Sequence, residues 1–228
     1  MSRILLLRIP ALLAAVLGSS CAPQGEHFNV TSPSSKVTAE ARIHPKDRHG
    51  MPVYPFQDKR RLVRTTAYTC SEADHLKYGS KSAAGSTLMY QRRARSAAAD
   101  WSYYPLGTTF RIKGMPALYV VDDYGSALTG TATIDLYKPN HQVMKQWGLR
   151  QVEVKVVKWG SMRRSVELLS KRTRHRHCRQ MLNNILRIQP ALRRYAQLDG
   201  LDKQPTLTEL ALADVPRGSL LGTRMGVW

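Results

Sequence analysis

Cysteine, phenylalanine and acidic residues are scarce in this chain. Its 228 residues include three Cys, three Phe and 16 Asp and Glu, against 35 Lys and Arg, so the formal net charge is +19. Three cysteines with no CxxC spacing exclude a disulfide-rich scaffold and a cysteine-rich zinc module. The surplus of positive charge favours an anionic partner, which would be nucleic acid, acidic lipid or a polymer that bears carboxylates.

The chain also has no apolar run long enough to cross a bilayer, which takes about 20 residues, and it has no internal repeat. Its hydrophobic share of 43% and charged share of 22% are ordinary for a folded protein, which excludes wholesale disorder and a fibrous protein. The length leaves room for one or two domains, since a single core commonly takes ~100–200 residues.

The first 20 residues have the pattern of a secretory signal peptide. Arg3 and Arg8 bracket a short basic region, an apolar run follows over residues 9–17, and three small residues precede Cys21. A Cys after small residues resembles a bacterial lipobox, in which Cys21 becomes the lipidated first residue of the mature chain, although position 18 is Gly where that motif usually has Leu. Plain signal-peptidase cleavage nearby is the alternative.

Export determines which partners the positive charge can meet. We expect a protein of the cell envelope on its periplasmic side, a lipoprotein of the inner or outer membrane, with membrane contact through the lipid and through the basic tail. An exported protein rarely meets nucleic acid, so none is expected as a partner. With Cys21 lipidated, Cys70 and Cys178 either pair as a disulfide in an oxidising compartment or stay as two free thiols.

Changes in composition divide the chain into four segments. Residues 1–20 form the signal peptide. Residues 21–60 are rich in Pro, Ser and Lys without an apolar period, so we expect a flexible tether with a short strand near 51–55. Residues 61–160 form a β-rich domain, and residues 161–228 form a basic, partly helical extension.

Short β-prone runs, separated by glycines, fill the third segment. Residues 141–147 are expected as a short helix closed by Gly148. Several short strands at close spacing predict a small β-barrel or sandwich. The strands are expected at residues 62–69, 108–112, 117–121, 131–137 and 150–159, the last alternating Val with polar residues in the period of a half-buried strand.

The extension contains a basic strip, residues 171–179, with five basic residues, two His and one Cys. This strip is expected to be solvated or disordered, or to lie on anionic lipid, and its His and Cys are not expected to bind a metal. From residue 181 onward, apolar side chains recur at helical spacing. They predict an amphipathic helix that Pro190 kinks or splits.

Asp123 and Asp135 are the first candidates for chemistry. They flank a loop that holds Gly125 and Gly130, so a strand, a turn and a second strand would bring both carboxylates to one end of a barrel. Two carboxylates in a partly dry cleft cannot both ionise easily, so the pKa of one rises, as proton donation to a leaving oxygen requires. Asp pairs in loops also cap turns, and spacing alone does not separate the two roles. Glu72 and its polar neighbours are expected on a solvated surface loop, with a place in the lining of the cleft as the alternative.

An ordered set of short motifs resembles the three-Asp (3D) domain, a double-psi β-barrel found in membrane-bound lytic transglycosylase A and in related wall-active proteins. The resemblance implies a mainly β fold, a six-stranded double-psi β-barrel with a mixed or helical basic extension. The three aspartates would be Asp100, Asp123 and Asp135. The set comprises Thr-Ala-Tyr at 66–68, Ser-Ala-Ala-Gly at 82–85, Ala-Ala-Ala-Asp at 97–100, Tyr-Pro-Leu-Gly-Thr at 104–108, then Asp123, Gly125, Ala127, Gly130, Asp135 and Tyr137, and Trp-Gly at 147–148.

The resemblance also implies a lytic transglycosylase. Such an enzyme cuts the β-1,4 bond between N-acetylmuramic acid (MurNAc) and N-acetylglucosamine (GlcNAc) in peptidoglycan strands and leaves a 1,6-anhydro end. Asp135 would act as acid and then as base, and Asp123 would raise its pKa or orient it. Asp100 would fix a turn or bind substrate, and no cofactor or metal is implied. The other candidate substrate-binding residues are Tyr68, Gly125, Ser126 and Tyr137.

Two departures from the family pattern leave a non-catalytic interpretation open. The interval from Asp123 to Asp135 is 12 residues, one more than the family usually has. A loop or bulge would absorb the extra residue, whereas a shifted register would turn Asp135 to the other face. No segment matches the second domain that completes the glycan groove of the family's transglycosylase. The alternatives are a peptidoglycan-binding envelope lipoprotein without activity and a structural envelope protein whose basic tail makes the partner contact.

Overall fold

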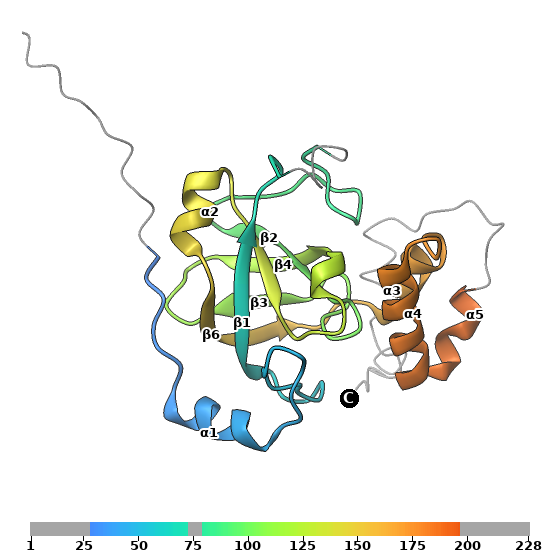
Figure 1. The fold of residues 1–228 in the computed structure, drawn as a ribbon, viewed down its shortest axis with the longest axis horizontal. Helices are drawn as coiled ribbons and strands as arrows, with labels where there is room; N and C mark the ends of the chain where they lie inside the picture. Colours follow the sequence, from blue (N-terminus) through green and yellow to red (C-terminus); the bar gives the residue numbers. More distant parts are fainter. Residues whose placement is uncertain (1–27, 73–78, 197–228) are drawn as a thin grey trace, which may run out of the picture.

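Six strands close into a barrel in the computed structural model, which describes residues 28–72 and 79–196 (Figure 1). The strands are β1 (Arg60–Tyr68), β2 (Ala94–Ala99), β3 (Thr109–Ile112), β4 (Leu118–Asp123), β5 (Ile134–Tyr137) and β6 (Arg150–Lys158). Their order around the barrel is β1-β5-β2-β4-β3-β6. The pairs β1–β5 and β2–β4 are parallel and the others are antiparallel. The predicted mainly β, six-stranded barrel is thus confirmed, and its mixed pairing is consistent with a double-psi barrel.

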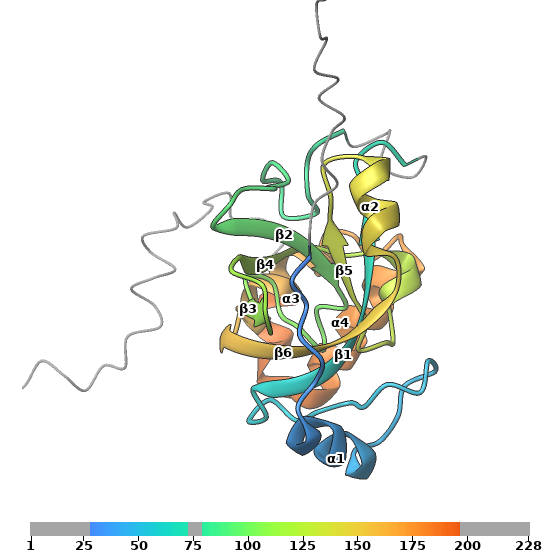
Figure 2. The same cartoon turned by 90° about the vertical axis from the view of Figure 1, so that its left-hand side faces the viewer.

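Helices lie at several places around the outside of the barrel (Figure 1). They are α1 (Ser35–Ile43), α2 (His141–Trp147), α3 (Met162–Ser170), α4 (Arg176–Ile188) and α5 (Arg193–Ala196), with 3₁₀ turns η1 (Ser126–Leu128) and η2 (Pro190–Leu192). Figure 1 shows α3, α4 and α5 grouped on one side of the barrel and α1 near one end, and in Figure 2 α3 and α4 lie behind the barrel. Helix α2 has the predicted bounds and is capped by Gly148, whose φ is 60°. The predicted amphipathic helix corresponds to α4, which starts earlier, at Arg176, and ends before Pro190.

The barrel interior follows the predicted alternation in β6. Val152, Val154 and Val156 are at most 1% exposed and face the core. Strand β2 was not expected, because its sequence is mostly Ala, which has a low β-propensity. It nevertheless pairs with β4 on one side and β5 on the other, and its small side chains suit the inside of a small barrel.

The helical extension shares this core. Val166 and Leu169 of α3 and Cys178, Met181 and Ile185 of α4 are 0% exposed and belong to the same hydrophobic cluster as the barrel strands. The described part of the extension is therefore packed on the barrel rather than attached to it by a linker.

Gly160 allows the extension to leave β6 against the turn at 105–108. A Cβ atom on Gly160 would lie 2.2 Å from the carbonyl oxygen of Leu106, so only glycine fits here. The Gly160 N–H donates to Thr108 Oγ1 at 3.0 Å, and the Ser161 N–H donates to the Leu106 carbonyl oxygen at 2.9 Å. These bonds fix the direction in which α3 begins.

The segment before β1, residues 28–59, is not the flexible tether that the sequence predicted. Helix α1 buries Val37 and Ala41, and an isolated bridge between Lys46 and Pro52 takes the place of the strand expected near 51–55. The rest of the predicted tether, residues 21–27, and the signal peptide lie outside the described residues.

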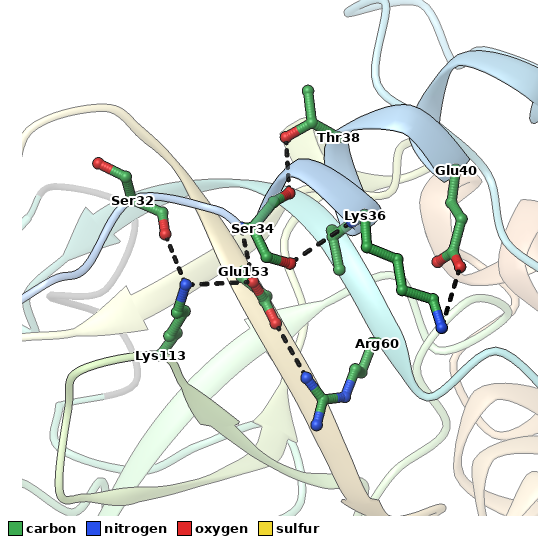
Figure 3. A network of polar contacts seen from close by, with 9 residues as sticks. Ser32, Ser34, Lys36, Thr38, Glu40, Arg60, Lys113 and Glu153 are labelled. Atoms are coloured by element: carbon green, nitrogen blue, oxygen red, sulfur yellow. Dashed lines mark hydrogen bonds and ion pairs between the residues drawn. The ribbon is translucent and has the colours of Figure 1, made fainter.

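Polar contacts hold this segment to the barrel, which is why an apolar period did not reveal it. Glu153 of β6 accepts a hydrogen bond from the Ser34 N–H at 2.9 Å and lies 3.5 Å from Arg60 and 3.7 Å from Lys113 (Figure 3). Lys113 also donates to the Ser32 carbonyl oxygen at 2.9 Å. Burial alone would raise the pKa of Glu153, but the Ser34 N–H and the two cations bring it below its ordinary value.

The sequence suggested that the basic strip at 171–179 is solvated, but part of the strip packs against the barrel. The Arg172 guanidinium donates to the Ala83 carbonyl oxygen at 2.7 Å and to the Tyr124 hydroxyl at 3.3 Å. Helix α4 begins inside the strip, and its Cys178 is fully buried. The strip therefore contributes contacts to the barrel, while its other Lys and Arg side chains are exposed.

Candidate functional site

A cavity of about 450 Å³ lies where β1, β5 and the turn after β4 meet. A second hollow of the same size lies on α4 and α5, and none of its lining residues is acidic. The first cavity is the candidate site because it contains Asp135. Its lining residues are Arg48, His49, Arg64, Thr66, Ala67, Tyr68, Glu72, Ala98, Tyr124, Gly125, Ser126, Ala127, Leu128 and Asp135.

Asp135 lies on β5 between β1 and β2, with Thr66 and Ala98 as its cross-strand partners. The Thr66 hydroxyl donates to Asp135 Oδ1 at 2.7 Å. Burial raises the pKa of Asp135 to about 6, and the negative charges of Glu72 and Asp123 add to this rise. The Thr66 hydrogen bond and the Arg64 charge act in the opposite direction. Near neutral pH this carboxyl is therefore present in both protonation states, as a proton donor and acceptor requires.

The extra residue between Asp123 and Asp135 does not turn Asp135 into the core. Its neighbours Ile134 and Leu136 are 0% exposed and point inward, while Asp135 lines the cavity. Because successive side chains of a strand point to opposite faces, this register is the one that presents the carboxyl to solvent. The loop before β5 thus absorbs the insertion.

Asp123 lies behind the cavity wall rather than in it. It is 3% exposed and accepts hydrogen bonds from the Tyr68 hydroxyl at 3.1 Å, the Ala83 N–H at 2.9 Å and the Tyr124 N–H at 2.9 Å. Two of these partners, Tyr68 and Tyr124, line the cavity. Asp123 therefore positions the wall and raises the pKa of Asp135 from a distance.

Glu72 is a second carboxylate of the cavity. A solvated loop was the expectation for it and the cleft the alternative, and the structure places it in the cavity lining together with Asp135. Its effect on the pKa of Asp135 is larger than that of Asp123. Its carboxylate accepts a hydrogen bond from the Thr69 N–H at 3.1 Å, which holds it where β1 ends. No sequence pattern pairs these two carboxylates, because the closing of the barrel brings them together.

Asp100 does not reach the cavity, so the structure does not support its candidate role in substrate binding. It is 0% exposed, and its carboxylate accepts from the Ser102 N–H at 2.7 Å, the Ser102 hydroxyl at 2.6 Å and the Gly130 N–H at 2.6 Å. These are the bonds of a residue that fixes turns, which was the other expectation for Asp100.

Asp122 is a second buried carboxyl with a raised pKa. Burial brings its pKa to about 6, and the Ser96 hydroxyl donates to it at 2.6 Å. It does not line the cavity. A raised pKa by itself therefore does not identify a proton donor in this barrel, whereas access from the cavity distinguishes Asp135.

The other predicted substrate-binding residues divide in the same way. Gly125, Ser126 and Tyr68 line the cavity, whereas Tyr137 does not. Tyr68 is only 5% exposed, and its ring packs edge-on against Tyr137 with centroids 5.6 Å apart. The Tyr137 hydroxyl contacts Cys70 Sγ at 3.5 Å. The two tyrosines therefore act first as packing residues of the wall.

Cys70 and Cys178 are both free thiols, so the disulfide that the sequence allowed is not formed. Cys70 lies beside Tyr137, while Cys178 is a buried residue of α4 beside Tyr124. Cys21 lies outside the described residues. Within residues 28–72 and 79–196 there is no helix of the length and apolar character needed to cross a membrane and no cluster of metal-binding side chains.

Thr66→Val should raise the pKa of Asp135 above about 6, because the variant removes the hydroxyl that stabilises the carboxylate. A ¹³C NMR titration of the Asp135 carboxyl measures this shift directly. Thr65→Val is the matched control, since the fully buried Thr65 hydroxyl donates to the Arg150 carbonyl oxygen instead. An unchanged Asp135 titration in Thr66→Val would show that the hydroxyl does not tune the carboxyl.

Residues 95–168 match the family model of the 3D domain. The match confirms the resemblance that the motifs suggested, and it contains the three aspartates Asp100, Asp123 and Asp135. No curated protein matches the chain. The matched range begins in β2 and ends in α3. Part of the cavity lining therefore lies outside the matched range. It comes from the segment before β1, from strand β1 and from Glu72.

Proposed function

We propose that this chain is a peptidoglycan lytic transglycosylase that cleaves the MurNAc–GlcNAc β-1,4 bond. The observation that carries the proposal is the carboxyl of Asp135, which opens on a cavity and has a pKa of about 6. The 3D domain supports the choice of substrate, because this family is associated with barrels that act on peptidoglycan.

The proposed reaction uses Asp135 twice. The protonated carboxyl donates its proton to the glycosidic oxygen, and the bond from that oxygen to C1 of MurNAc breaks. The Asp135 carboxylate then accepts the proton of the MurNAc C6 hydroxyl, whose oxygen forms the new bond to C1. Water is not consumed, the 1,6-anhydro ring closes, and Asp135 returns protonated to its starting state.

The neighbours of Asp135 keep it suited to both steps. Burial and Glu72 favour the protonated form that the first step needs. Thr66 and Arg64 favour the carboxylate that the second step needs, and Thr66 also fixes the orientation of Oδ1. A pKa near the working pH is the compromise that serves a group acting first as an acid and then as a base.

Incubating the purified protein with insoluble peptidoglycan and identifying the products tests the proposal. We expect soluble muropeptides with 1,6-anhydro-MurNAc ends, which mass spectrometry distinguishes from reducing ends because they lack one water. Reducing ends in their place would show that water is the acceptor, with Glu72 available as the base that activates it. Either that result or the absence of products would contradict the proposal.

A non-catalytic peptidoglycan-binding protein remains the second candidate. The helices of the extension contribute no residue to the cavity lining, so in the described part of the chain no second domain encloses a glycan groove. Binding to insoluble peptidoglycan that survives Asp135→Asn, with no release of muropeptides by the unmodified chain, is the outcome that favours this candidate.

The proposed substrate also requires export. We propose that the first 20 residues direct the chain to the periplasmic side of the envelope and that Cys21 carries a lipid. A Cys21→Ser variant should then lose incorporation of labelled fatty acid and move from the membrane fraction to the soluble one. Equal labelling of both forms would reject lipidation.

A further inference from the structure

Basic side chains from two separate segments line the cavity that also holds Asp135 and Glu72. Arg48 and His49 come from the segment before β1, and Arg64 comes from β1 itself. Neither arginine forms an ion pair with another residue in the described parts of the chain. Two guanidinium groups therefore remain available in a site that also holds the proton donor.

Arg48 is held in place by the turn that carries it. The neighbouring Asp47 carboxylate accepts from the His49 and Met51 N–H groups at 2.8 and 2.9 Å, and from the Ala132 N–H at 2.8 Å. The Arg48 guanidinium also donates to the Ala127 carbonyl oxygen. The turn is thus fastened to the loop before β5 on one side and to η1 on the other. An arginine fixed in this way loses little conformational entropy when it binds.

Arg64 lies two residues before Thr66 on β1, so the two side chains share a face of the strand. Its guanidinium donates to Thr133 Oγ1 at 3.2 Å, which uses one of its five N–H groups. Its positive charge acts on Asp135. Arg64 therefore places a cation beside the reacting group without neutralising it in a short ion pair.

We propose that Arg48 and Arg64 bind a carboxylate of the glycan and so select strands that contain muramic acid. The proposal rests on the proposed function and deepens it. A guanidinium binds a carboxylate through paired, charge-assisted hydrogen bonds. Chitin-like strands have the same β-1,4 backbone but no carboxylate, so they would leave both arginines without a partner.

The carboxylate has two chemical sources in peptidoglycan. It is the free lactyl carboxylate of a MurNAc residue without peptide, or a carboxylate of the peptide stem where one is attached. The same two arginines recognise either source. The segment before β1 then belongs to the binding site, although the sequence pattern suggested a tether.

Isothermal titration calorimetry on the full chain with Asp135→Asn, which prevents turnover, tests the proposal. The ligands are a GlcNAc tetramer, a peptide-free GlcNAc–MurNAc tetrasaccharide, the same tetrasaccharide with its lactyl groups amidated, and the stem-bearing form. We expect the two acidic ligands to bind at least about 10-fold more tightly than the two neutral ones. The stronger of the two acidic ligands identifies the source of the carboxylate.

Variants of the two arginines connect this preference to the site. Arg48→Gln and Arg64→Gln should each reduce the preference for acidic ligands and leave affinity for the GlcNAc tetramer unchanged. Lys155→Gln is the matched control, because it removes the same charge from an exposed position on β6 outside the cavity. Asp47→Ala, which releases the turn, should resemble Arg48→Gln.

Two outcomes overturn the proposal: equal affinity for acidic and neutral ligands, or the same loss in Lys155→Gln as in the arginine variants. The second outcome would mean that net charge, not the site, attracts the ligand. Failure of the proposed function looks different. If the chain binds acidic ligands selectively but forms no 1,6-anhydro products, the proposed enzymatic activity fails and the carboxylate-binding site stands. If it forms 1,6-anhydro products but binds neutral and acidic ligands equally, the activity stands and the carboxylate-binding site fails.

Discussion

Asp135→Asn should reduce the formation of 1,6-anhydro products by about a thousandfold, within the range that general acid–base catalysis supplies. The amide has the shape of the carboxyl but cannot donate a proton to the glycosidic oxygen or accept one from the C6 hydroxyl. Thr66 can still donate to the amide oxygen, so the geometry of the cavity should persist. The rate of product release from peptidoglycan, followed by mass spectrometry, measures the loss.

Asp122→Asn is the matched control for this experiment. Asp122 has the same raised pKa of about 6 and is also buried, but it does not line the cavity. An Asn at this position still accepts the Ser96 hydrogen bond. We expect activity close to that of the unmodified chain. If Asp122→Asn lost activity as fully as Asp135→Asn, access from the cavity would not be what selects the proton donor.

The pH dependence of activity follows from the same pKa. The first chemical step requires protonated Asp135, whose fraction decreases as the pH rises through about 6. We therefore expect kcat/KM to decrease above about pH 6 and the decrease to move to higher pH in Thr66→Val. A profile that rises through this range would show that the carboxylate is the form required in the free enzyme.

Stability should show the opposite consequence of this pKa. A carboxyl whose pKa is raised in the folded state stabilises the fold most below its unfolded value of about 3.9, and this contribution is lost as the pH rises through about 6. Asn does not ionise, so the Asp135→Asn variant does not lose stability as the pH rises through about 6. Above pH 6 the variant should therefore be at least as stable as the unmodified chain. A lower melting temperature at pH 8 would mean that the loss of activity includes a loss of fold.

The sequence predicted most of the barrel because its strands carry their own signals. The Val alternation of β6 and the glycine-bounded runs around β3, β4 and β5 follow the period of a half-buried strand. Strand β2 has no such signal, since an Ala-rich run has low intrinsic preference for a strand. Only the 3D-domain motif ending in Asp100 marked its position.

The segment before β1 was misjudged for a related reason. Its contacts with the barrel are mainly polar, through Asp47, Ser34 and Glu153, and a polar contact leaves no periodic pattern in a sequence. The 3D-domain resemblance does not help here, because the matched range starts later. No pattern in the sequence therefore indicated that Arg48 lines the cavity.

The candidate site was predicted in part. Motif order identified Asp135, and the structure adds the reason it is suited to chemistry, namely a buried position beside Thr66 that still opens on a cavity. The assignment of Asp123 as the neighbour that raises the pKa of Asp135 was incomplete, because Glu72 has the larger effect on that pKa. That effect depends on distances across the closed barrel, which spacing along the chain does not contain.

The extension should prove necessary for the stability of the barrel, and Met181→Ala tests this. Met181 is 0% exposed in α4 and packs in the barrel's core cluster, so its truncation should lower the free energy of unfolding by about 2–5 kcal/mol. Thermal and urea denaturation followed by circular dichroism measure the change. Ile188→Ala, on the same helix but 52% exposed, should stay within about 0.5 kcal/mol.

Ending the chain at residue 160 should have a still larger effect. It removes five apolar side chains that are 0% exposed, Val166, Leu169, Cys178, Met181 and Ile185. At roughly 1.5–3 kcal/mol for each large apolar side chain, the loss is of the order of the whole stability of a domain, about 5–15 kcal/mol. We expect no cooperatively folded barrel from this truncation. For that reason, a partner contact of the basic tail is better tested by replacing exposed cations such as Arg174 and Arg179 with Gln. A truncated barrel that melted like the full chain would show that the helices cover a core already complete without them.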